Sequence, residues 1–206
     1  MAIFYLAVQS VRRGEGRSAV AAAAYRAGEK LDDERTGETF NYTRRRGVVA
    51  SEVIGWQGDR SSLWNAAEAA ENRKNSVVAR EIVIALPCEL DDVRRAELVK
   101  SFAHWLHSRH GVAIDYAIHS PDKDGDQRNH HAHLMVTTRK IEGGRMGAKT
   151  RELDQKQHSR KHIEAWRSEW AAICNRALAL GGTDTALDHR SYLRQAEPFG
   201  AVPLEP

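Results

Sequence analysis

The sequence is poor in cysteine and lacks a long apolar run, and both absences narrow the class of protein. Its 206 residues include only two cysteines, Cys88 and Cys174, which is not the disulfide framework of a small secreted domain. No apolar stretch approaches the roughly 18 residues of a membrane helix. The short apolar start is followed by charges rather than preceded by them, unlike a signal peptide. We therefore expect a cytoplasmic protein without membrane insertion.

A Gly-rich phosphate loop is also missing, so no nucleotide cofactor is expected. The net charge is only +3 and the pI is near 8.9, values that permit a nucleic-acid partner without arguing for one. Local clustering of the basic residues carries more information than their sum. The candidate phosphate contacts are Arg44, Arg45, Arg46, Arg73, Lys74, Arg80, Arg139 and Lys140. A solvated surface charge is the plainer interpretation of each one.

The order of the expected elements indicates an α+β fold in one domain. Apolar, β-branched runs predict strands, and Ala-rich or amphipathic stretches predict helices. The strands are expected at 3–10, 80–87, 112–119 and 130–139, and the helices at 18–31, 59–75, 89–111 and 157–180. Residues 33–54 are predicted to form a hairpin, and residues 141–149 a Gly-rich loop. Strands and helices do not alternate regularly, so we predict a central antiparallel β-sheet with helices packed on it.

Histidines are concentrated where the strand 130–139 begins, in the segment "RNHHAHLMVTTR". Side chains alternate along a strand, so His131 and His133 share one face and His130 points to the other. His119 ends the preceding strand, which is expected to be the hairpin partner, and can lie beside the pair. Three imidazoles that converge with open positions left on the ion are typical of a catalytic metal site. The alternative is a solvated strand end that happens to be rich in histidine.

Two further residues are candidates for chemistry. Tyr25 lies among alanines in "SAVAAAAYRAGEK", with room beside its ring and no bulky stripe to join, although a tyrosine on a helix is most often a packing residue. Glu81 is expected to open the strand 80–87, where a carboxylate could orient a metal-bound histidine or accept a tyrosine proton. An ordinary charge at a strand end is the alternative. The histidines of the expected helices, among them His110, are predicted to be solvated.

Taken together, these blocks resemble the MobA/MobL-type conjugative relaxases, plasmid mobilisation proteins of the HUH endonuclease superfamily. The resemblance extends from Met1 to about Tyr192, and it rests on the segments "SAVAAAAYRAGEKLDDERTGETFNYTRRRGVVASEVI", "LWNAAEAAENRK", "AREIVIALP", "AIHS", "NHHAHLMVTTR" and "LDHRSY". It implies that Tyr25 is the catalytic tyrosine, that Glu81 is the active-site glutamate, and that the metal ligands are His119, His131 and His133.

One position departs from the family pattern. Where the family usually has Asn-Pro-His-x-His, this chain has His130 in place of the proline, and the ligand spacing is kept. The resemblance also implies a single nicking domain over residues 1–206, which in family members often continues into a primase, helicase or other region.

The activity implied by the resemblance is site- and strand-specific nicking and rejoining of DNA at an origin of transfer. The tyrosine would attack the phosphorus and keep the 5′-phosphate, with one divalent ion on the scissile phosphate. Mn or Mg is the first expectation, with Zn, Co or Ni as alternatives. Implied partners are single-stranded DNA, with or without an adjacent DNA hairpin, accessory relaxosome proteins and a coupling protein. The protein itself is expected to be a monomer.

Three other functions fit parts of the pattern. A rolling-circle replication initiator would use the same chemistry, but its tyrosine usually follows the histidine motif, whereas Tyr25 precedes it. A metal-dependent phosphodiesterase with a water nucleophile would need further carboxylate ligands, and only Glu81 offers one. A non-catalytic DNA-binding module would use the histidines for a structural ion.

Overall fold

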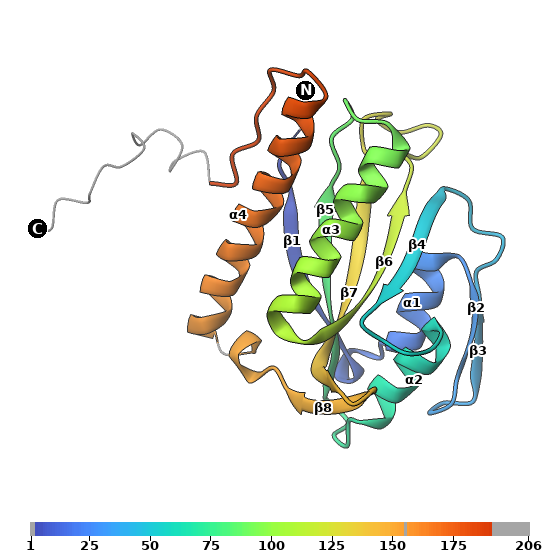
Figure 1. Cartoon of the computed structure of the whole chain (residues 1–206). Coiled ribbons are helices and arrows are strands. Elements are labelled where there is room, and N and C mark those ends of the chain that lie inside the picture. Colours follow the sequence, from blue (N-terminus) through green and yellow to red (C-terminus); the bar gives the residue numbers. More distant parts are fainter. Residues whose placement is uncertain (1–2, 155, 191–206) are drawn as a thin grey trace, which may run out of the picture.

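The computed structural model describes residues 3–154 and 156–190, and a six-stranded antiparallel sheet runs through this part of the chain (Figure 1). The strand order is β1-β5-β7-β6-β4, with β8 paired to the far end of β7, and β2 and β3 form a small separate sheet. The strands are β1 Leu6–Arg12, β2 Lys30–Asp33, β3 Glu38–Asn41, β4 Val48–Ile54, β5 Val77–Ala85, β6 Val112–His119, β7 His131–Glu142 and β8 Arg145–Lys149. The helices are α1 Ala19–Ala27, α2 Arg60–Ala69, α3 Asp92–His110 and α4 Lys156–Leu180, with short 3-10 turns at Arg13–Glu15 and Arg151–Leu153.

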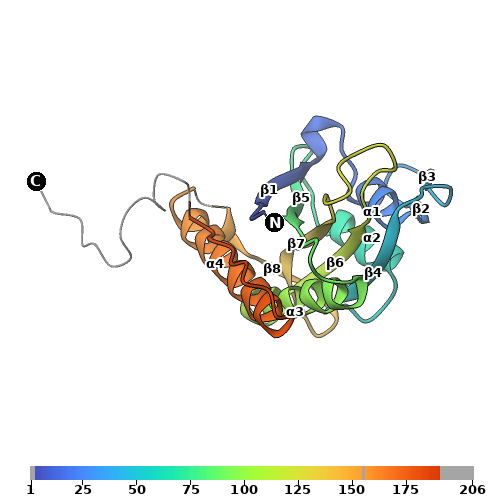
Figure 2. The same cartoon turned by 90° about the horizontal axis from the view of Figure 1, so that it is seen from above.

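The two faces of the sheet are covered differently (Figure 2). Helices α3 and α4 lie on one face, and their Phe102, Trp166 and Trp170 pack into the larger hydrophobic core. Helices α1 and α2 lie on the other face, where Trp64 and Met135 are buried between helix and sheet. This second face also carries the histidines, next to the C-terminal end of α1.

Helix α1 lies close to the sheet because its buried side chains are mostly alanines. Ser18 caps its start, with Oγ accepting from the Ala21 backbone nitrogen at 3.2 Å. Gly28 ends it in a left-handed conformation with φ of 67°, which a residue with a Cβ rarely adopts. The helix therefore ends at Ala27, two residues after Tyr25, rather than continuing to residue 31 as predicted.

The predicted α+β class and antiparallel sheet are confirmed, and several local predictions are corrected. Residues 33–54 do not form one hairpin: β3 pairs with β2, whereas β4 joins the edge of the main sheet beside β6. The Gly-rich segment 141–149 contains β8, which pairs back on β7. Strand β5 starts at Val77, so Glu81 lies in its middle. The pairing of β4 with β6 joins segments about sixty residues apart, and local composition does not encode it.

Among the predicted solvated histidines, His110 is buried, and its Nε2 accepts from Trp166 Nε1 at 2.9 Å. Burial lowers the pKa of His110 to about 4, which keeps the ring neutral as a core residue. None of the described helices is both long and apolar enough to cross a membrane.

Candidate active site

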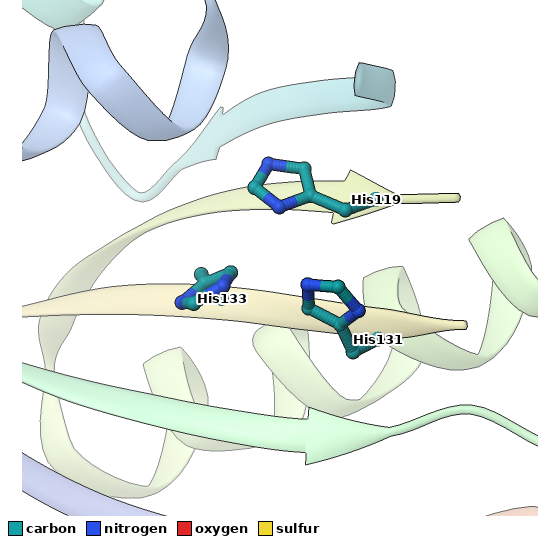
Figure 3. A group of neighbouring side chains, drawn as sticks. All are labelled: His119, His131 and His133. Atoms are coloured by element: carbon teal, nitrogen blue, oxygen red, sulfur yellow. The ribbon is translucent and has the colours of Figure 1, made fainter. Parts of the chain in front are cut away.

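His119, His131 and His133 come together at the accessible end of the sheet, as the sequence predicted (Figure 3). His119 is the last residue of β6 and lies directly opposite His131, the first residue of β7. His133 follows two residues later on the same face. The ring centroids are 5.1 to 5.4 Å apart, and one nitrogen from each ring lies within 4.8 Å of the others. These three side chains form the histidine triad.

Each ring of the triad uses one nitrogen for a hydrogen bond to the protein. His119 Nε2 donates to the Arg26 carbonyl at 2.8 Å, and His131 Nδ1 donates to the Asn129 carbonyl at 3.0 Å. His133 Nδ1 donates to the Glu81 carboxylate at 2.7 Å. The tautomers are thereby fixed, and a lone pair remains on His119 Nδ1 and on Nε2 of the other two rings. Such bonds from the second nitrogen are typical of metal-binding histidines.

The environment of the second ring nitrogen of His119 shows whether the triad fits a cation. Nδ1 of His119 is buried, and no hydrogen-bond donor contacts it within the described part of the chain. Burial lowers the pKa of His119 to about 4, with the charges of His133 and Arg45 acting in the same direction, so the ring is neutral at pH 7. A buried, unprotonated and unpaired lone pair is costly unless a cation or donor satisfies it. The triad therefore fits a metal ion.

Glu81 lies behind the triad and is completely buried. It accepts hydrogen bonds from His133 Nδ1, Arg26 Nε and Gln9 Nε2. Burial raises the pKa of its carboxyl, but the bonds from His133 and Arg26 outweigh burial and lower it to about 2. Glu81 is thus an ionised carboxylate that holds His133 in place. Of the two roles that the sequence left open, its contacts favour orientation of a histidine.

Tyr25 lies on α1 beside the triad, and its side chain is 48% exposed. The ring of Tyr42 meets it edge-on, with centroids 5.1 Å apart. The guanidinium carbon of Arg45 lies 3.8 Å from the Tyr25 ring centroid. Arg26, the next residue along the chain, contacts His119 through its carbonyl and Glu81 through its side chain. Tyr25 is therefore on a helix end that is fixed directly to the histidine site.

The predicted phosphate contacts fall into separate places. Arg44, Arg45 and Arg46 lie in the loop between β3 and β4, beside Tyr25. Residues 73–74 and 139–140 lie at the other end of the sheet, about 26 Å along β7 from His131 at roughly 3.3 Å per residue. Arg80 is only 5% exposed and donates to Thr150 and Asp154, so we leave it out of the phosphate contacts proposed below.

Two features of the site were not predicted from the sequence. One is Arg26, whose carbonyl and guanidinium both act in the site; no sequence motif marks a backbone carbonyl as a partner. The other is an apolar groove of about 530 Å³ that is lined by His131 and His133, by residues of β5, and by Tyr5, the residue before β1. Tyr5 is 52% exposed. The sequence showed only that an aromatic residue lies in an expected strand, and it did not show that this residue is exposed. Tyr192, near which the family resemblance ends, lies outside the described residues.

The six-stranded antiparallel sheet with its helices is a relaxase-like fold, and in this chain it carries three converging histidines at the ends of adjacent strands. The model of the MobA/MobL family matches residues 17–199, and the chain belongs to this family. It is 38% identical over 230 residues to the mobilization protein MobL of Acidithiobacillus ferridurans, covering 96% of this chain and 61% of MobL. It is 32% identical over 239 residues to the conjugal transfer protein TraA of Agrobacterium fabrum, covering 100% of this chain and 21% of TraA.

Solved structures give the same result for the fold. One reported as "Molecular Basis of Vancomycin Resistance Transfer in Staphylococcus aureus" superposes with a TM-score of 0.80 at 29% identity, over 93% of this chain and 100% of that one. The conjugative relaxase TrwC in complex with oriT DNA superposes with a TM-score of 0.50 at 12% identity, over 86% of this chain and 69% of that one. The second likeness concerns the fold alone.

Proposed function

We propose that this chain nicks and rejoins one DNA strand at an origin of transfer, with Tyr25 as nucleophile, for conjugative mobilisation. The observation that carries the proposal is the double contact of Arg26, which ties the helix of Tyr25 to both His119 and Glu81. An exposed phenol is thereby held next to three nitrogen ligands. Membership of the MobA/MobL family supports the same function, and the relatives named above are described as mobilization and conjugal transfer proteins.

In the proposed step, a bond forms between Tyr25 Oη and the scissile phosphorus as the bond from phosphorus to the 3′-oxygen breaks. Tyr25 gives its phenolic proton to the solvent, and the leaving 3′-oxygen takes up one proton from the solvent, so the protons balance. A divalent cation bound by the histidine triad would withdraw charge from the phosphate and stabilise the negative charge that develops. Three neutral imidazoles leave that ion its full charge; Mn²⁺ and Mg²⁺ are the first candidates, and Zn²⁺, Co²⁺ and Ni²⁺ the alternatives.

The phosphotyrosine linkage retains the energy of the broken phosphodiester, so rejoining needs no nucleotide cofactor. Glu81 acts through His133: it fixes the ring and leaves Nε2 free for the ion. The covalent adduct, and not the set of ligands, separates Tyr25 from a water nucleophile, because three histidines can also hold an ion that activates water. Within the described residues, the group that could hold an ion consists of the three histidines without a carboxylate.

The DNA is proposed to be single-stranded at the cut. The groove between His131 and Tyr5 is lined by the small side chains of Val83 and Ala85 and by the aromatic ring of Tyr5. Such a groove suits an unpaired base stacked on Tyr5, because every base has an apolar face that can stack on an aromatic ring. Four of the candidate phosphate contacts lie at the far end of the sheet: Arg73, Lys74, Arg139 and Lys140. They could contact the DNA only if it runs along the sheet, and a hairpin stem of about eight base pairs would span that length.

A covalent-capture experiment tests the proposed function. Single-stranded oligonucleotides tiled across the DNA that adjoins the gene, labelled at the 3′ end, are incubated with the protein and Mn²⁺ or Mg²⁺. We expect one of them to give a labelled adduct that survives denaturant and is absent with EDTA. A released 5′-phosphorylated fragment without an adduct would replace this proposal with the water-nucleophile one. Accessory relaxosome proteins and a coupling protein are the partners to test next.

A further inference from the structure

We infer that Arg45 is a catalytic residue whose guanidinium binds a non-bridging oxygen of the scissile phosphate. The inference rests on the proposed function and goes further by separating one arginine from the other candidate phosphate contacts. It also assigns that arginine to the reacting group rather than to the DNA backbone in general.

The first support is the position of Arg45. Its loop turns at Arg45, whose nitrogen donates to the Tyr42 carbonyl at 2.8 Å, and the loop is fastened to the site where the Ser120 nitrogen donates to the Gly47 carbonyl at 2.9 Å. Ser120 directly follows the triad residue His119. The guanidinium, 3.8 Å from the centre of the Tyr25 ring, therefore lies against the proposed nucleophile and beside the triad.

The second support is an unbalanced charge. The buried or largely buried arginines Arg26, Arg60, Arg80 and Arg95 each pair with a carboxylate. Arg45 has no such pair within the described part of the chain, and its Nε is buried without a hydrogen-bond partner. Its side chain contacts the Tyr25 ring. A partly buried guanidinium without an acid is costly in the free protein, and an anion between Tyr25 and the triad would satisfy it.

The chemistry of the step explains why the cation lies there. When Tyr25 Oη attacks, negative charge builds up on the non-bridging oxygens, and a guanidinium presents donors in the planar geometry that phosphate oxygens accept. A preorganised donor aimed at developing charge accelerates a reaction more than it strengthens ground-state binding. Arg45 is expected to affect the rate of cleavage more than the affinity for DNA.

A purely structural role is the competing explanation, in which Arg45 only packs on the ring and fixes its orientation. The two explanations differ in whether the effect of Arg45 depends on the phosphate oxygens. A methylphosphonate replaces one non-bridging oxygen of the scissile linkage by a methyl group, and the two diastereomers can be separated. Substrates of this kind form a double-mutant cycle with variants of Arg45.

The experiment compares wild type, Arg45→Ala, Arg45→Lys and the control Arg94→Ala in single-turnover cleavage. Arg94 is an exposed arginine of α3, on the other face of the sheet. Far-ultraviolet circular dichroism and the melting temperature verify the fold of each variant. On the natural phosphodiester we expect Arg45→Ala to be slower by about 10²- to 10³-fold, Arg45→Lys to recover part of the rate, and Arg94→Ala to stay within a few-fold. On one methylphosphonate diastereomer, the ratio of wild-type to Arg45→Ala rates should fall close to one.

A second measurement needs neither metal nor cleavage. In EDTA, the methylphosphonate at the scissile linkage should weaken DNA binding by the wild type and make no difference to Arg45→Ala. An unchanged rate in Arg45→Ala, or the same rate ratio on the phosphodiester and on both diastereomers, would overturn the inference in favour of packing alone. If the wild type itself gave no cleavage on any strand, the proposed function would fail instead.

Discussion

Glu81→Gln is the substitution that tests most closely how the site is built. The change keeps the shape of the side chain but removes the charge that three donors share. His133, Arg26 and Gln9 all bond to this carboxylate, and an amide oxygen can satisfy only part of them. The Arg26 guanidinium, 12% exposed, would lose its charged partner. We expect the folded state and the metal site to weaken together.

The size of each loss can be worked out from the structure. The Glu81 carboxyl has a pKa of about 2 instead of 4.5, a difference that corresponds to about 3 kcal/mol of stabilisation of its charged form. Because the pKa is lowered, this stability is present above pH 4.5 and is lost as the pH falls toward 2. Breaking a buried ion pair costs a similar amount, about 3–5 kcal/mol. Loss of the bond to His133 should weaken metal binding about 10- to 100-fold.

Urea unfolding measures the first quantity, and calorimetric titration of Mn²⁺ at a pH near 7 measures the second. Glu71→Gln is the matched control, because Glu71 is also a buried carboxylate and pairs with Arg139 and Lys149 at the far end of the sheet. The control should lose stability and keep its metal affinity. If Glu81→Gln bound Mn²⁺ within twofold of the wild type, or if Glu71→Gln weakened binding equally, Glu81 would not be the residue that orients His133.

Three further outcomes are expected. His133→Ala should weaken metal binding by orders of magnitude, whereas His130→Ala, outside the triad, should leave a titration with Mn²⁺ unchanged; equal losses would contradict the assignment of ligands. Tyr5→Ala should weaken the binding of single-stranded DNA by about 1–3 kcal/mol, measured by fluorescence anisotropy, whereas Tyr5→Phe keeps the ring and should bind as the wild type does. Unchanged binding by Tyr5→Ala would show that no base stacks in the groove. Arg73→Ala and Lys74→Ala should lower the affinity for an oligonucleotide with a hairpin stem and should make that binding depend less on salt. Binding of a short unpaired strand should not change. Equal effects on the two oligonucleotides would rule out a stem at that end of the sheet.

The histidine site could be predicted from the sequence because its information is local. Alternation along a strand puts His131 and His133 on one face, and the hairpin of β6 and β7 brings His119 beside them. The α+β class followed from the types of segment in the same way. What could not be predicted depends on contacts between distant segments. Glu81 reaches His133 only because β5 pairs with β7, and the place of β4 beside β6 puts the loop of Arg45 over Tyr25.

Burial was the second kind of missing information. The sequence places both Arg80 and Arg139 at the ends of expected strands, where each is equally a candidate for contact with phosphate. In the structure, Arg80 is buried and donates to Thr150 and Asp154. His110 is likewise enclosed by α4, which the sequence places more than fifty residues away. A polar residue on an amphipathic segment is expected to be solvated until its tertiary partner is known.

The site of covalent attachment is the most direct test of the account. The five tyrosines lie on five different tryptic peptides, and Tyr25 is alone in SAVAAAAYR, residues 18–26. Mass spectrometry of the trapped and digested adduct should find the nucleotide on that peptide, and Tyr25→Phe should form no adduct while it still binds metal and DNA. Attachment to the peptide of Tyr5, Tyr42, Tyr116 or Tyr192, or cleavage by Tyr25→Phe at the wild-type rate, would contradict the assignment of Tyr25 as the nucleophile.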